Sequence, residues 1–327
     1  MMRRMIPVLL LLCLLLCSCQ AGDPIAPMAS TATDLYVPAP DAAEALPRED
    51  IATLWFRFGS EPLLAPEQRV LTLSPTAPYE LTLLQALAAG PAAASTELSG
   101  LFPPGTKVLS THRQGRTLFV TLSRQIMNDF PDEPADWAAD PAFSAETPLR
   151  RQLAMQAIAA TVTENCDIDQ VVILVEQTSQ GSDSLRLRQR YYRTPGMSED
   201  LAAPLMRDES MLLTAHQTLA LILDCCAEQN LPRLYPFIAR RDPANGKDRP
   251  TYETFCAQMD TLPRLSAWEA SAGSVSADGQ SAVFNVRLTL LDGGQVREQR
   301  CVIRLHRERD LWRIGLSQLT GREGDLP

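Results

Sequence analysis

Two glycine-containing turns, Asp278-Gly279 and Asp292-Gly293-Gly294, separate apolar stretches near the end of this 327-residue chain. Such residues are preferred in tight hairpins, because the turn backbone adopts positive φ angles. The turns therefore predict an antiparallel meander with four strands, Leu265–Val275, Ser281–Leu291, Val296–His306 and Leu311–Leu316. Three predicted helices precede the meander. The first has an apolar stripe at Leu212, Ala215, Leu219, Ile222, Leu223 and Cys226, and two shorter helices follow around residues 234–238 and 252–259.

Helices followed by a meander resemble the α+β cone of the nuclear-transport-factor-two-like (cystatin-like) superfamily. The resemblance covers residues 208–327, and Trp312-Arg313-Ile314 ends the last strand as is common in that fold. It implies a second domain in which helices pack on a curved antiparallel sheet, with a pocket between them. The fold by itself confers no activity on that pocket.

Residues 51–207 contain a different order of predicted elements. Residues 53–58 alternate like a half-buried strand, and 70–73 is a second short strand. A helix over 80–89 ends at Gly90-Pro91, and a hairpin joins 107–111 to 117–123 with Leu118, Val120 and Leu122 facing inward. Thr147-Pro148 predicts an N-cap and first-turn proline for a helix to about residue 165, and 171–175 is a central strand.

Motifs in this order resemble the GerMN domain of sporulation and spore-germination lipoproteins in Gram-positive bacteria. They are Leu87-Ala88-Ala89-Gly90-Pro91, Leu101 to Val108, Val120 to Ser123, Ala157-Ile158, Thr161 to Thr163, Val171 to Glu176 and Ala203 to Leu205. The resemblance implies an α+β domain with the order ββαββαβ. Leu122 stands where the family more often has an acid, and residues 124–146 are a longer insertion than usual.

The N-terminal residues predict that the chain is exported and anchored to a membrane. Arg3 and Arg4 precede an eleven-residue apolar run, Ile6 to Leu16, which is too short to span a bilayer but fits a signal peptide. Leu16-Cys17-Ser18-Cys19 resembles the bacterial lipobox, so residues 1–18 are expected to be removed and Cys19 to be acylated. The alternative is an ordinary signal peptide. Residues 19–50, with five prolines after Cys19, predict an extended tether.

Composition argues against several activities. The net charge of −9 disfavours nucleic-acid binding, which needs a cationic surface. Nucleotide and hydrolase fingerprints are absent from the sequence, and the three histidines, His112, His216 and His306, have no metal spacing. Ser123 has no base near it in sequence. An acidic cluster lacks calcium-loop spacing and is predicted to be a solvated loop; its members are Asp129, Asp132, Glu133, Asp136 and Asp140. No catalytic, cofactor-binding or metal-binding residue is therefore predicted.

Five cysteines follow Cys19, an odd number, so at least one thiol stays free or pairs with another chain. They are Cys166, Cys225, Cys226, Cys256 and Cys301. Cys226 and Cys256 lie on predicted apolar helix stripes and are the most plausible disulfide, because export permits such bonds. Buried free thiols are the alternative.

The leading hypothesis is a non-catalytic, lipid-anchored binding or scaffold protein on the extracytoplasmic face of the cell membrane, acting in sporulation or germination. Its expected partners are the membrane, through Cys19, and envelope or sporulation proteins, with self-association through strand edges as another route. One alternative is a general cell-wall lipoprotein of the same build. A third is an enzyme whose acid or base lies in the second domain's pocket.

Overall fold

The computed structural model describes residues 48–177, 183–196 and 198–321. Residues 45–327 group into one compact unit. The predicted signal peptide, Cys19 and most of the predicted tether lie outside the described residues. Within them, no helix combines the length and apolar character needed to cross a membrane.

The first sheet pairs two long antiparallel strands and one short strand in the order β2-β1-β3, which are Leu64–Leu73, Arg48–Phe58 and Leu98–Ser99. Helix α2 spans Tyr79–Ala88 and follows β2. Both predicted strands are present, but each begins earlier than predicted. Strand β2 starts at Leu64 and includes Pro66, whose missing N–H is tolerated because β2 is an edge strand.

The second sheet has the order β4-β5-β6-β7, with bounds Val108–Gln114, Thr117–Leu122, Gln170–Glu176 and Ser184–Arg186. The predicted hairpin is β4–β5, and Leu118, Val120 and Leu122 are buried as expected. Strands β5 and β6 run parallel, so the connection between them must cross over. Helix α3, Glu146–Asn165, lies within that connection, preceded by a 3-10 turn at Arg124–Met127.

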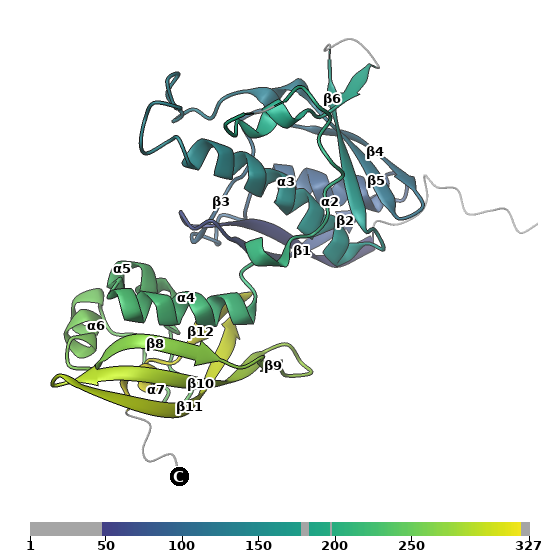
Figure 1. The fold of residues 1–327 in the computed structure, drawn as a ribbon. Coiled ribbons are helices and arrows are strands. Elements are labelled where there is room, and N and C mark those ends of the chain that lie inside the picture. The colour runs from purple at the N-terminus through teal and green to yellow at the C-terminus, as the bar shows by residue number, and fades with distance from the viewer. Residues whose placement is uncertain (1–47, 178–182, 197, 322–327) are drawn as a thin grey trace, which may run out of the picture. The chain divides into compact units, whose positions relative to one another are not determined.

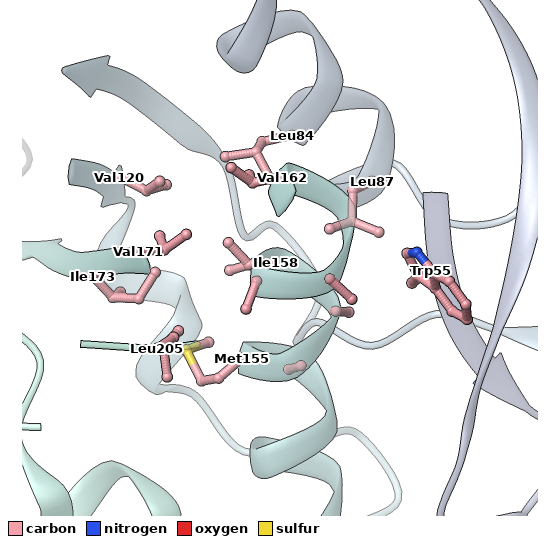
Figure 2. Packing of buried hydrophobic residues seen from close by; sticks show 14 of the residues in the cluster. Trp55, Leu84, Leu87, Val120, Met155, Ile158, Val162, Val171, Ile173 and Leu205 are labelled. Atoms are coloured by element: carbon pink, nitrogen blue, oxygen red, sulfur yellow. The ribbon is translucent and has the colours of Figure 1, made fainter. Parts of the chain in front are cut away.

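Helix α3 packs against strands of both sheets (Figure 1). Figure 2 shows Ile158 of α3 facing Val120, Val171 and Ile173 of β5 and β6. The second half of the helix is buried on several sides, which its small side chains permit, as at Ala154, Ala157, Ala159 and Ala160. The GerMN-like half of the chain therefore has one core with α3 at its centre.

The predicted start of α3 is wrong in detail. The helix begins at Glu146, the residue before it is Ala145, and no side chain caps it. Thr147 lies inside the first turn, fully buried, and its hydroxyl has no hydrogen-bond partner. The helix begins two residues earlier than predicted because Thr147 N–H donates to Phe143 O, which extends the first turn backward into the insertion.

The C-terminal half contains the predicted helices and meander. Helices α4, α5 and α6 span Ala215–Glu228, Leu231–Leu234 and Tyr252–Met259, and a 3-10 turn follows α5 at Tyr235–Phe237. Thr214 caps α4 by accepting a hydrogen bond from Gln217 N–H. The sheet order is β12-β11-β10-β8, antiparallel throughout, with β9 also on β10; the bounds are Leu311–Ile314, Gln295–Glu308, Ser281–Asp292, Arg264–Ala270 and Ser274–Val275.

Helix α4 lies over one face of this sheet, and the short helix α7, Leu316–Thr320, follows β12 (Figure 1). Buried side chains from α4, α6 and the sheet form a second hydrophobic cluster, which also includes Phe58 and Ala65. Short 3-10 turns at Gln189–Tyr192 and Glu209–Met211 precede α4. The fold is α+β, as predicted, and the domain boundary at residue 207 stays a prediction.

Candidate functional site

A cavity of about 470 Å³ lies between the helices and the sheet of the C-terminal half. Its walls come from the end of α4, the segment after α6, the middle of β10 and β11, and α7. The sheet residues reach it through strand alternation, because every second side chain faces the helices. Its apolar lining is Leu223, Met259, Leu262, Pro263, Leu265, Leu288, Leu290, Val302, Ile303 and Leu319.

Polarity along this cavity follows the pairing of β10 with β11. Phe284 pairs with Ile303 and Val286 with Cys301, and all four are apolar or weakly polar. Toward the hairpin, Leu288 pairs with Gln299, and Leu290 with Arg297. Asp292, at the turn, pairs with Gln295. The cavity is therefore apolar toward the middle of the sheet and polar toward the hairpin end.

The titratable side chains lining the cavity do not form an acid–base pair. They are Asp292, Arg297, Cys226 and Cys301. Burial raises the pKa of the Cys226 thiol to about 12 and also raises the pKa of Cys301, so both stay protonated at neutral pH. The two thiols therefore do not supply the thiolate that a cysteine nucleophile needs.

Cys226 and Cys256 are both free thiols in the structure, so the predicted disulfide is not formed here. Cys226 is buried on α4, and Cys256 is half-buried on α6. The other three described cysteines, Cys166, Cys225 and Cys301, are free as well. Of the five, only Cys225 and Cys226 are buried; Cys166, Cys256 and Cys301 are half-buried.

The acidic cluster of the 124–146 insertion is only partly solvated. Asp129 and Glu133 both form ion pairs with Arg193, and each lies 3.7 Å from the Arg151 guanidinium. The side chains of Arg151 and Glu133 are each only 1% exposed. Arg151 also lies 5.3 Å from the centre of the Tyr191 ring, a cation–π contact. Sequence reasoning missed this network, although the Arg150-Arg151 pair so soon after an acidic loop was a signal for it.

A second ion group joins the same insertion to the start of α3. Arg150 makes a bidentate contact with Asp132, at 2.7 and 2.8 Å, and its Nε lies 2.7 Å from Glu146. Buried Arg57 of β1 also pairs with Glu146. Because bidentate arginine–carboxylate contacts fix both partners, the insertion is fastened to the helix and the first sheet. Asp136 and Asp140 form no ion pair among the described residues.

These contacts predict acid sensitivity. Burial raises the pKa of Glu146, but hydrogen bonds from Arg57 and Arg150 outweigh it and hold that pKa below 4.5; the Arg150 contact lowers the pKa of Asp132 below 3.8. Since both values are depressed in the folded state, their stabilisation is present above the ordinary carboxyl pKa and lost as pH falls. We expect the free energy of unfolding to decrease between about pH 5 and pH 3. Denaturant titration at a series of pH values measures it.

Glu146→Gln removes one titrating group from this ion group and should make the acid-induced decrease shallower. Asp136→Asn serves as the matched control, because this exposed carboxylate has no ion pair within residues 48–177, 183–196 and 198–321, and its replacement should leave the pH profile unchanged. An identical profile for Glu146→Gln and the parent protein would contradict the assignment.

The remaining sequence candidates have structural roles or are isolated. Ser123 is buried at the end of β5, and its hydroxyl accepts a hydrogen bond from Lys107 N–H at 2.9 Å. His112, His216 and His306 lie on β4, α4 and β11. Across the described residues, no group of three or more histidine, cysteine or acidic side chains is arranged to hold a metal ion.

Strand β4 forms a free edge of the second sheet. It pairs with β5 on one side, and no described residue pairs with its other side. A register shift at Leu109 marks a bulge near its start, and Ser110 to Gln114 then pair regularly with β5. The other long edge differs, because on β2 the Gln68 N–H donates to Asp310 at 2.9 Å. The edge of β4 thus offers unused backbone groups to a further strand.

Residues 65–181 match the Germane family model, whose description is sporulation and spore germination. The chain carries a GerMN-type domain. This match points to a protein related to sporulation or germination. No curated protein matches the chain.

Solved structures are similar to part of the chain. One shows the tandem GerMN domains of the sporulation protein GerM from Bacillus subtilis. The sequence identity is 15%, the match covers 49% of this chain and 46% of that chain, and the TM-score is 0.32. This chain thus spans about half of that GerM structure. A putative lipoprotein from Clostridium perfringens has 20% identity over 50% of this chain and 90% of that one, with a TM-score of 0.27. A third is RV0760c from Mycobacterium tuberculosis in complex with estradiol-17beta-hemisuccinate. The sequence identity is 18%, the match covers 30% of this chain and 87% of that one, and the TM-score is 0.25.

Proposed function

We propose that this GerMN-type chain is a lipid-anchored, non-catalytic binding protein on the extracytoplasmic face of a bacterial membrane, where it holds a partner protein during sporulation or spore germination. The family description supports the process. The lipobox-like Leu16-Cys17-Ser18-Cys19 and the proline-rich segment after it support the anchor and the tether.

The free edge of β4 is the observation that carries the binding role. An exposed strand edge binds an extended segment of another chain through backbone hydrogen bonds, and its side chains select the partner. Residues Ser110, His112, Arg113 and Gln114 are exposed along this edge. Arg113 is already paired with Glu80 and Asp167, so the exposed Ser110, His112 and Gln114 are the side chains that would select an extended partner segment with hydrogen-bonding residues.

The cavity lining supports binding over catalysis. Its thiols are protonated and its single carboxylate, Asp292, is exposed near the hairpin turn. A tether also favours a binding role, because it keeps both halves of the chain near the membrane at high effective concentration.

Site-specific photocrosslinking in cells tests the proposal. A photoreactive phenylalanine analogue in place of Ser110 should give one dominant adduct with another protein, which mass spectrometry identifies. The matched control carries the same analogue in place of Glu253, an exposed residue of α6. We expect the adduct at position 110 and not at position 253.

Lysine at exposed edge positions disfavours strand addition, so Ser110→Lys with His112→Lys should remove most of the complex recovered by affinity purification. Equal recovery from the lysine variant, or equal adducts at positions 110 and 253, would contradict partner binding at this edge. An adduct made of two copies of this chain would replace the proposed partner with self-association.

A further inference from the structure

The floor of the cavity consists of core side chains that keep a small exposed surface facing the cavity. Cys226, Met259, Leu265 and Ile303 retain between 5% and 9% of their exposure, while many other core residues of this half have none. Leu262, Leu288, Leu290 and Leu319 line it as half-buried side chains. A cavity of about 470 Å³ falls within the range of small-molecule sites, roughly 300–1,000 Å³. Filling it would remove apolar surface from water, which favours binding of an apolar group.

The mouth of the cavity offers hydrogen-bond donors that the protein does not use. Arg297 has no ion pair or hydrogen bond among the described residues, and it lies on the same face of β11 as Gln299. Gln318 of α7 lies at the other end of the cavity, where its side chain accepts a hydrogen bond from Arg304 N–H at 3.1 Å. Asp292 lies two pairs farther out than Arg297, at the turn. A head group beside Arg297 therefore meets a cation and the Gln299 amide, and Asp292 lies beyond them, toward the turn.

From this polarity we infer that the cavity binds a single-chain amphiphile with an anionic head group. The apolar chain packs on the floor formed by α4, α6 and the sheet, and the head group lies beside Arg297 and Gln299. Arg297 to Ile303 on β11 covers six residue steps, roughly 20 Å at about 3.3 Å per step, which accommodates a long acyl chain. This binding is additional to the proposed partner binding at β4 and does not depend on it.

Titration calorimetry on residues 20–327 tests the inference, since this form keeps every described residue and has no acylated Cys19 to compete. Three probes share one chain length: palmitate, palmitoyl-lysophosphatidylglycerol and hexadecanol. We expect at least one anionic probe to bind about tenfold or more tightly than hexadecanol, because a charge-assisted hydrogen bond favours it. The tighter of the two anionic probes shows whether the head group is a carboxylate or a phosphate.

Arg297→Ala should weaken the anionic probe about tenfold or more and leave hexadecanol unchanged. Arg300→Ala is the matched control, because Arg300 lies on the same strand but faces the opposite side of the sheet. Leu288→Trp should fill the cavity and abolish binding, with circular dichroism checking the fold; Leu290→Trp, nearer the mouth, replaces it if Leu288→Trp unfolds.

Binding of both anionic probes no tighter than that of hexadecanol, or an Arg297→Ala protein with parental affinity, would overturn the head-group assignment. Binding of none of the three probes, or undiminished binding by a folded tryptophan variant, would overturn the site itself.

Discussion

Replacing Glu133 with glutamine is expected to destabilise the protein by about 3–5 kcal/mol, the range for breaking a buried ion pair from one side. Glu133 lies between the guanidinium groups of Arg151 and Arg193, and its side chain is 1% exposed. The change keeps the shape but removes the charge, so Arg151 stays buried with only Asp129, whose side chain is 58% exposed, as a carboxylate partner. Chemical denaturation at neutral pH measures the free energy of unfolding.

Asp136→Asn is the matched control for Glu133→Gln, because both change one acid of the same insertion to its amide. Asp136 is exposed and has no ion pair among the described residues, so its replacement should stay within about 0.5 kcal/mol. Similar stabilities for the two variants would show that the network contributes nothing beyond an ordinary surface charge.

Replacing Cys19 with alanine is expected to abolish anchoring through lipid. The thiol is the proposed acylation point, and two acyl chains give stable attachment where the rest of the chain offers no spanning helix among its described residues. The variant should move from the membrane fraction to the medium, or keep its signal peptide. Cell fractionation with immunoblotting, and detergent-phase partitioning of the released form, measure the change.

Cys17→Ala is the control, because Cys17 precedes the proposed cleavage point and would not remain in the mature protein. It should leave fractionation and detergent partitioning unchanged. A Cys19→Ala protein that still partitions into detergent after cleavage of its signal peptide would exclude lipidation at this residue.

The turn residues and apolar periods predicted most elements of the fold, because those signals are local. Asp278-Gly279 and Asp292-Gly293-Gly294 lie where the meander turns, and the residues after both aspartates have positive φ. The division of the first half into two sheets was not predicted, since a period-2 pattern shows which face is buried and not which strand is the neighbour. Strand β2 was predicted only over residues 70–73. Its earlier part contains Pro66, a residue that local patterns disfavour inside strands.

The ion network in the insertion could not be read from the sequence for a similar reason. Arg193 meets Glu133 across 60 residues and Asp129 across 64, so no local spacing connects them. Taken without their partners, the same acidic residues predict a solvated loop. The cavity was expected from the resemblance to a cone fold, but the position of Arg297 beside Leu290 required the observed register of β10 and β11.

The proposed export would bring the thiols of this chain into a compartment where oxidants and disulfides are abundant. Burial raises the pKa of Cys166 to about 12 and that of Cys225 to about 11, in line with Cys226. At neutral pH only about one thiol in 10⁴ to 10⁵ is then a thiolate, and thiolates are the species that attack disulfides or become oxidised. Folding therefore keeps these three thiols from disulfide exchange in the proposed oxidising compartment, whereas a chain that unfolded there would expose them.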